Sequence, residues 1–156
     1  MKSISKYIKS QNIQFDETLN VNDLLEGLHE TDIYDTQNEI YETLNTFQLI
    51  SNETISSIQD KLKKYRIIND VYQLHRGKHV RWIKKDDQNH KLNMGGIVVD
   101  IKFYDNGTHI LIFNKYLKRN FLMHFDKIHI FQKLSFEEEV ILELISIRPN
   151  DAPVHR

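Results

Sequence analysis

The stretch GGIVVDIKFYDNGTHILIF, residues 95–113, predicts two β-strands joined by a tight turn. Apolar residues alternate along its first half, as in a strand that buries one face. One side of this strand carries Ile97, Val99, Ile101 and Phe103, and the other carries Val98, Asp100 and Lys102. The dipeptide Asn106-Gly107 is the strongest short hairpin signal, because both residues tolerate a positive φ angle. HILIF, residues 109–113, then returns as the partner strand.

More short strands with turn signals between them flank this hairpin. The further predicted strands lie in HVRWIKK (79–85), FLMHF (121–125) and IHIFQK (128–133). Five short strands in one small sheet bury too little apolar surface and leave edges unpaired, and closure into a barrel solves both problems. We therefore predict a five-stranded SH3-like β-barrel over residues 67–134. An OB-like barrel is the alternative, although its usual helix between the third and fourth strands has little room in NKYLKRN, residues 114–120.

Helices are predicted on both sides of the strands. Residues 1–66 contain three segments with helix-start signals, at Asn22, at the capping-box spacing of Thr36-Gln-Asn-Glu39, and at Ser51 or Asn52. The apolar residues at helical intervals are Leu24, Leu25 and Leu28 in the first segment, Ile40, Tyr41, Leu44 and Phe47 in the second, and Ile55, Ile58, Leu62 and Tyr65 in the third.

A second capping box, Ser135-Phe-Glu-Glu138, predicts a C-terminal helix over 135–148, followed by a flexible tail over 149–156. The predicted fold class is therefore α+β. It combines an acidic helical region over 1–66, the small barrel, and this C-terminal helix.

The net charge of −1 hides a strong asymmetry along the chain. Residues 1–60 carry 3 Lys/Arg and 11 Asp/Glu, a balance of −8, whereas residues 61–133 carry 16 Lys/Arg and 6 Asp/Glu, a balance of +10. Residues 134–156 carry 2 basic and 5 acidic residues, a balance of −3. A basic module flanked by acidic segments either meets a polyanion or docks on the chain's own acidic part.

The densest basic stretch is HRGKHVRWIKK, residues 75–85, which surrounds the only tryptophan with five Lys/Arg side chains and two histidines. Cations that follow phosphates and aromatic rings that stack on bases are the two components of many nucleic-acid grooves. The aromatic candidates are Trp82, Tyr104 and Tyr116, although Trp82 alternates in phase with Val80 and is also predicted to be core. The candidate nucleic-acid-binding residues are Arg76, Lys78, Arg81, Lys84, Lys85, Lys91, Lys118 and Arg119. A solvated outer face of the barrel is the competing explanation of these cations.

Residues from about 66 to 143 carry the segments RIINDVYQLHRGKHVRWI, GGIVVDIKF and IHIFQKLSFEEE. In these segments the chain resembles poorly characterised small proteins encoded by large double-stranded DNA viruses of protists. The resemblance implies a viral setting, in a virion or the host cytoplasm, and a role in the virion or in handling the genome. It carries no catalytic residue onto this sequence.

Several classes of function are not favoured by the sequence. The absence of cysteine excludes a disulfide framework and a cysteine zinc site. The six histidines between His75 and His129 have no acidic companion at ligand spacing, and no nucleotide or hydrolase motif is present. We expect no catalytic residues, no metal and no cofactor. Asp105 and Asp126 are attributed to turns.

The predicted function is a non-catalytic binding module whose basic barrel face contacts nucleic acid non-specifically. The alternative is a module for docking a protein partner, for self-association or for virion assembly. The apolar runs are too short for a membrane span and the N-terminus has no apolar signal region, so we expect a protein that neither enters a membrane nor is secreted.

Overall fold

A computed structural model describes residues 36–47 and 50–146. The helix predicted around Leu24 and Leu28 and the tail predicted for 149–156 lie outside these residues. The chain divides into two compact units. Residues 36–133 form one of them, and the described part of the other is residues 134–146.

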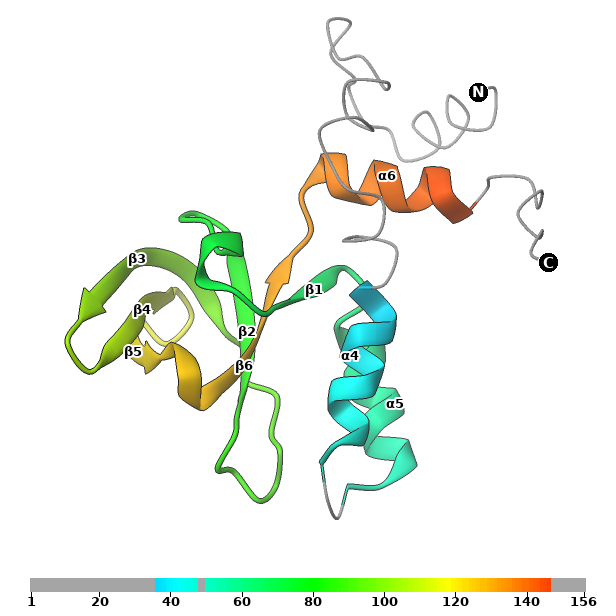
Figure 1. Ribbon diagram of the computed structural model, residues 1–156, viewed down its shortest axis with the longest axis horizontal. Helices are drawn as coiled ribbons and strands as arrows, with labels where there is room; N and C mark the ends of the chain where they lie inside the picture. Colours follow the sequence, from blue (N-terminus) through cyan, green and yellow to red (C-terminus); the bar gives the residue numbers. More distant parts are fainter. Residues whose placement is uncertain (1–35, 48–49, 147–156) are drawn as a thin grey trace, which may run out of the picture. The chain divides into compact units, whose positions relative to one another are not determined.

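The larger unit is built on one antiparallel sheet of six strands in the order β1-β6-β2-β3-β4-β5. The strands are β1 Tyr65–Ile68, β2 His79–Lys84, β3 Gly96–Tyr104, β4 Gly107–Asn114, β5 Arg119–His124 and β6 Ile128–Lys133. Two single-turn helices, η1 Val71–Gln73 and η2 Phe125–Lys127, connect β1 to β2 and β5 to β6. Two α-helices, α4 Thr36–Asn45 and α5 Asn52–Lys61, precede the sheet. Figure 1 shows this helical pair on one side of β2 and the β3–β4–β5 strands on the other.

The α+β class is confirmed, but the five-stranded barrel is not. The sheet has six strands and is not closed, because β1 and β5 stand at its two ends. The additional strand, β1, begins at Tyr65, inside the region predicted to be helical. α5 begins where predicted, with Ser51 as its N-cap accepting a hydrogen bond from the Thr54 amide, and it ends at Lys61 with Leu62 as C-cap. The apolar residues at helical spacing therefore continue past the end of the helix, because Leu62 is its C-cap and Tyr65 begins β1.

The sheet separates two apolar cores. The inner core contains Val80 and Trp82 of β2, as the alternation predicted, together with aliphatic residues of the other strands. The outer core lies between the helical pair and the outer face of β1, β6 and β2. Its members are Ile40, Leu44, Ile55, Ile58, Leu62, Ile67, Ile83 and Phe131. Ile83, the neighbour of Trp82 along β2, is therefore buried on the opposite face of the sheet.

A bulge in β3 overturns the predicted apolar face of that strand. The pairing with β4 jumps between Val98 and Asp100, so Val99 is an extra residue on the β3 side. Val98 is buried in the inner core, and Ile101 packs against it beyond the bulge. Ile97, Val99 and Phe103, which were predicted to share one buried face, are exposed. The bulge changes which residues point inward, a shift that simple alternation cannot anticipate.

The β3–β4 hairpin is confirmed, although its turn differs from the prediction. Tyr104 pairs with Gly107, so the two loop residues are Asp105 and Asn106. Of the predicted pair Asn106-Gly107, only Gly107 adopts a positive φ, of 123°. A Cβ atom at this glycine would come within 2.8 Å of the His124 ring, so both the backbone and the neighbouring ring require glycine.

The described part of the smaller unit contains one helix, α6 Phe136–Ser146. Its predicted capping box is confirmed. The Ser135 hydroxyl accepts a hydrogen bond from the Glu138 amide, and the Glu138 carboxylate accepts one from the Ser135 amide. Among the helices of the described residues, none is long and apolar enough to cross a membrane.

Candidate nucleic-acid interface

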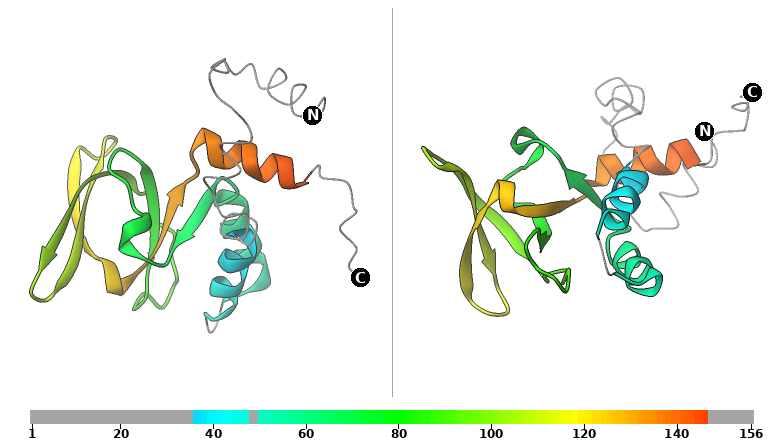
Figure 2. Two further views of the ribbon diagram at one scale, coloured as in Figure 1. Left: turned by 45° about the horizontal axis from the view of Figure 1, so that its top comes forward. Right: turned by 60° about the horizontal axis from the view of Figure 1, so that its bottom comes forward.

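The β2–β3 loop, residues 85–95, and the β4–β5 turn, residues 115–118, form the two walls of a hollow of about 220 Å³. We call this hollow the loop pocket. Trp82 and Phe121, from β2 and β5, line it together with residues 91–95 on one wall and Asn114, Tyr116 and Leu117 on the other. Figure 2 gives two further views of the sheet and of the loops at its ends.

The wall formed by the β2–β3 loop is held against β2. Leu92 forms an isolated bridge with Ile83, and the Asn93 amide donates a hydrogen bond to the Trp82 carbonyl at 2.9 Å. The Arg81 Nε donates to the Asn93 carbonyl, also at 2.9 Å. Gly95 closes this wall against the backbone of Val80, where a Cβ atom would lie 1.8 Å from the Val80 carbonyl oxygen. Only glycine permits this close approach, so it fixes the end of the loop against the Val80 backbone.

Asn114 connects the two walls. Its side-chain oxygen accepts hydrogen bonds from the Tyr116 and Leu117 amides, each at 2.9 Å, and so shapes the β4–β5 turn. Its side-chain nitrogen donates to the Gly95 carbonyl at 2.6 Å. The residue is buried, and a buried amide with these partners fixes its surroundings strongly. The loop pocket is therefore a preformed feature of the sheet end.

Three cations line the loop pocket or lie over a ring that lines it. Lys91 lines it directly. The Lys115 ammonium lies 5.4 Å from the centre of the Tyr116 ring, and the Arg119 guanidinium lies 5.3 Å from the centre of the Phe121 ring. Both distances are within cation–π range. Of the described residues, no Asp or Glu lines the hollow, so its local charge is positive.

Trp82 is a core residue, and its predicted role in stacking on bases stays a prediction. Only 2% of its surface is exposed and it belongs to the inner core, as its alternation with Val80 predicted. It also lines the loop pocket, with its ring 5.8 Å from that of Phe121. Its indole Nε1–H is buried and has no hydrogen-bond partner among the described residues.

The predicted cations do not form one surface. Lys91, Lys118 and Arg119 lie on the β2–β3 loop or at the β4–β5 turn, beside the loop pocket. Arg76 precedes β2 and forms an ion pair of 2.6 Å with Asp100. Lys78 is also outside the pocket, next to β3, where its carbonyl accepts a hydrogen bond from the Val98 amide.

The other three cations predicted in the basic stretch differ in their surroundings. Arg81 is half-buried and supports the loop through Asn93. Lys84 is exposed at the end of β2. The Lys85 amide donates a hydrogen bond to the Lys127 carbonyl. Among the aromatic candidates, Tyr116 joins Trp82 at the loop pocket, whereas Tyr104 lies at the β3–β4 hairpin with its ring 5.1 Å from that of His109.

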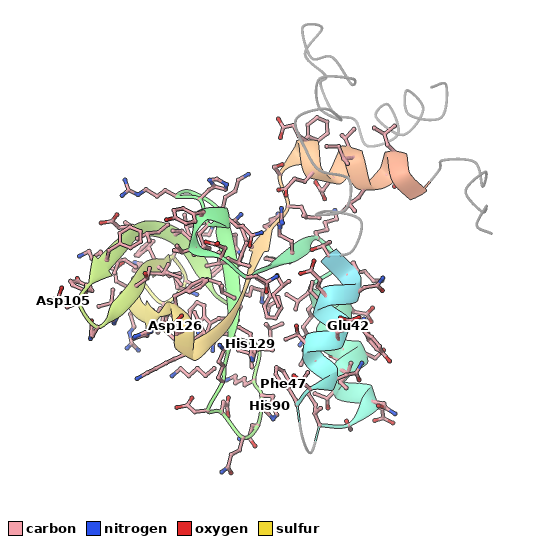
Figure 3. The ribbon with its side chains drawn as sticks, in the orientation of Figure 1. Glu42, Phe47, His90, Asp105, Asp126 and His129 are labelled. Atoms are coloured by element: carbon pink, nitrogen blue, oxygen red, sulfur yellow. The ribbon has the colours of Figure 1, made fainter. Side chains whose placement is uncertain are left out.

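A second, more open hollow of about 520 Å³ lies between the end of α4 and the first half of the β2–β3 loop. Figure 3 shows Phe47, His90 and His129 gathered there, with Asp105 and Asp126 elsewhere. The Phe47 ring stacks on His90 at 4.4 Å and lies 5.2 Å from His129. Burial lowers the pKa of His129, and the charges of Lys85 and His90 lower it further. Lys85, Asp86 and Asp87 give this hollow mixed charge.

The histidines of the strands lie at separate places. The His124 ring lies 4.7 Å from that of His109, and His129 faces Phe47. Among the described residues, no three His, Asp or Glu side chains form a group that could hold a metal ion.

Sequence reasoning missed Asn114, Met94, Leu117 and Phe121 as parts of the site. Asn114 carried a signal, because asparagine side chains often accept hydrogen bonds from the backbone of a following turn. Its contact with Gly95, 19 positions earlier, leaves no trace in the sequence.

A scan against protein-family models, a search of curated proteins and a search of solved structures found no match to this chain. The resemblance to proteins of large DNA viruses therefore stays a prediction.

Proposed function

We propose that this chain is a non-catalytic module that binds nucleic acid, and that the loop pocket and its cations form the contact surface. A viral setting, in a virion or in the host cytoplasm, belongs to the proposal only through the sequence resemblance. The observation that carries the proposal is that Lys91 lines the loop pocket together with Tyr116 and Phe121. Lys115 and Arg119 lie over the rings of these two residues. Phosphates attract such cations, and exposed rings stack with bases of any sequence.

The charge of the larger unit supports this choice. Residues 36–133 carry 16 Lys/Arg and 10 Asp/Glu, a balance of +6. The acidic side chains of α4 and α5 belong to helices whose apolar faces bury Ile40, Leu44, Ile55 and Ile58. The helical pair is therefore attached by an apolar core on the outer face of β1, β6 and β2, which leaves the loop pocket open.

The proposal is tested by fluorescence anisotropy with short labelled single- and double-stranded oligonucleotides and the full chain at several salt concentrations. On single strands, affinity should fall with a log–log slope of about −0.7 per phosphate neutralised. Replacing Lys91, Lys115 and Arg119 together by glutamine should make that slope shallower by about 2. The matched control replaces Lys84, Lys102 and Lys127, which removes the same charge away from the pocket. Absence of binding, or equal effects of both triple variants, would contradict the proposal.

A second candidate, docking to another protein, is favoured by one feature. The outer face of β3, β4 and β5 carries exposed apolar residues: Ile97, Val99, Phe113 and Leu122. Ile97 pairs with Phe113, and Leu122 pairs with Leu111, so these side chains lie in adjacent rows. Sedimentation velocity compares the wild type with Leu122→Lys. Self-association that this change abolishes would favour docking over nucleic-acid binding as the role of the sheet.

A further inference from the structure

We propose that two copies of this chain form a dimer through β5. The free edges of the two β5 strands pair in antiparallel fashion, with Leu122 opposite its own copy on the two-fold axis. The inference goes beyond nucleic-acid binding, because it names the strand and the partner for the docking function. The dimer is measured without nucleic acid, so its failure would leave the proposal for the loop pocket intact.

The first argument is that the two ends of the sheet are covered differently. At one end α4 lies against β1, where the Gln37 side chain donates a hydrogen bond to the Tyr65 carbonyl at 3.3 Å and the Asn69 side chain donates one to Glu39 at 2.9 Å. At the other end, among the strands of residues 36–47 and 50–146, β5 pairs with β4 alone. Its second edge therefore presents backbone amides and carbonyls that a further strand can use.

β5 also lacks the features that usually protect an edge strand from pairing. It runs over Arg119–His124 without a proline, and Arg119 is its only Lys or Arg. Its register with β4 is continuous over six residue pairs, so no bulge bends it away. Leu122, near its middle, is 52% exposed. The strand is therefore regular, apolar at its centre and open to a second strand.

The second copy fits this edge because β5 is complementary to itself. Residues directly opposite each other in an antiparallel pair point to the same face of the sheet, so the two-fold axis passes through a residue. With Leu122 on the axis, Phe121 lies opposite Met123 of the second copy, and Asn120 lies opposite His124. Phe121 and Met123 both pack against the inner core, so they share one face. An aromatic ring opposite a thioether is a favourable pair.

The same register also brings opposite charges together. Lys118 directly precedes β5, Asp126 lies two residues after it, and both side chains are exposed. With Leu122 on the axis, Lys118 of each copy lies beside Asp126 of the other. Each end of the strand pair therefore gains one attraction between opposite charges.

The neighbouring registers are less complementary. Moving the axis one residue toward the C-terminus sets Arg119 opposite Lys127, which places like charges together. Moving it one residue the other way sets Leu122 opposite Asn120, which places an apolar side chain against a polar one. The register with Leu122 on the axis is therefore the one that the side chains favour.

The pairing closes at two copies. A two-fold axis uses the β5 edge of both copies, and β1 at the far end of each sheet is covered by α4. A contact without this symmetry would leave an open edge and build a filament. One pair of short strands is a small interface, and small interfaces are transient. We therefore expect a weak dimer, with a dissociation constant in the micromolar range and no larger species.

The first experiment is sedimentation velocity of the full chain from low to several hundred micromolar. We expect a reversible equilibrium between monomer and dimer. Leu122→Lys sets like charges opposite each other on the axis and should raise the dissociation constant at least about fivefold. Phe113→Lys is the matched control, because Phe113 is exposed on the same face but belongs to β4. A monomer at every concentration, or equal weakening by the two variants, would overturn the proposal.

The second experiment tests the register through disulfide formation, since the chain has no cysteine of its own. Residues directly opposite in an antiparallel pair have Cα atoms about 4.5–5.5 Å apart, a span that a disulfide can bridge. Under mild oxidation Leu122→Cys should form a covalent dimer, whereas Phe113→Cys should stay monomeric. Equal cross-linking of both variants would mean that the outer faces pack on each other, and it would overturn pairing through the β5 edge.

Charge reversal tests the contact at the ends of the strand pair. Lys118→Glu and Asp126→Lys each place like charges side by side, and each should raise the dissociation constant roughly threefold. The double variant restores the attraction with the signs exchanged and should recover the wild-type constant. Additive weakening by the two changes would overturn the register with Leu122 on the axis.

Discussion

The two halves of the sheet differ in how their faces are covered. The β1–β6–β2 half has the inner core on one face and the helical pair on the other, so Ile130 and Phe131, neighbours along β6, are buried on opposite faces. Within residues 36–47 and 50–146, the β3–β4–β5 half is covered only on its inner face, and its outer face exposes Ile97 and Leu122. Its loops carry the loop pocket. The difference indicates that the first half holds the fold together, whereas the end of the second half is available for binding.

The largest expected effect is the difference in unfolding free energy lost when one phenylalanine of each half is replaced by alanine. Phe131 is fully buried in the outer core. Phe131→Ala should lower the free energy of unfolding by about 3–5 kcal/mol, through lost apolar burial and the cavity left behind. Phe103→Ala, in the β3–β4–β5 half where the side chain is 71% exposed, should change it by less than about 0.5 kcal/mol. Urea denaturation measures both, and equal losses would contradict the comparison.

The second prediction concerns the place where the halves meet, at the start of β3. Gly95→Ala should destabilise the protein by about 1–2 kcal/mol because its φ of 77° is left-handed, and by about 1–3 kcal/mol more because the new Cβ meets the Val80 carbonyl. Gly77→Ala is the control. Its φ is 86°, but nothing lies within 4 Å, so only the backbone cost of about 1–2 kcal/mol applies. The midpoint of thermal unfolding of Gly95→Ala should therefore be well below that of Gly77→Ala. The reverse order would mean that the close approach at Gly95 is relieved at little cost.

The third prediction tests whether the loop pocket is preformed. Asn114→Ala leaves the Gly95 carbonyl and the Tyr116 and Leu117 amides without their side-chain partner, which should cost about 1–3 kcal/mol. It should also weaken oligonucleotide binding, because the two walls are no longer joined. Asn120→Ala, at an exposed position of β5, is the matched control. Unchanged binding by a folded Asn114→Ala variant would show that the walls do not need this connection.

The smallest expected effect is a pH dependence that originates in the well-covered half. Burial lowers the pKa of His79, and the charges of Arg81 and Lys133 lower it further; the pKa of His129 is lowered for similar reasons. Below a pH of about 6.5 the unfolded chain therefore takes up protons that the folded chain resists. The free energy of unfolding should therefore be highest above that pH. It should fall as the pH drops toward the lowered pKa values of His79 and His129.

Urea midpoints at neutral and mildly acidic pH measure this effect. His79→Gln combined with His129→Gln should reduce the loss of stability on acidification, whereas His75→Gln, at an exposed position, should leave it unchanged. A double variant that loses as much stability as the wild type would place the acid sensitivity elsewhere.

Local patterns predicted much of the fold. The hairpin at 104–107, the start of α5 at Ser51 and the capping box at Ser135 each depend on residues close together in the chain, so short-range rules identify them. The buried face of β3 was wrong because the bulge at Val99 arises from pairing with β4. β1 was missed because Tyr65 continues a helical spacing by chance, while its pairing with Lys133 is set by the sheet.

The candidate site could be predicted only as a list of residue types. The basic composition of 61–133 and the aromatic candidates were visible in the sequence. Their grouping was not, since the contact between Asn114 and Gly95 and the ion pair between Arg76 and Asp100 are tertiary. The sheet thus separates the cations of residues 61–133, with Arg76 paired to Asp100 and Lys91 at the loop pocket.

The most direct test of the central claim is amide chemical-shift mapping by NMR of the full chain titrated with a short oligothymidylate. We predict that the largest shifts fall in residues 91–95 and 114–121, with little change in the hairpin at 104–107 or in α5. Shifts centred instead on Ile97, Val99 and Leu122, or on Arg76 and Lys78, would contradict the assignment of the binding surface to the loop pocket.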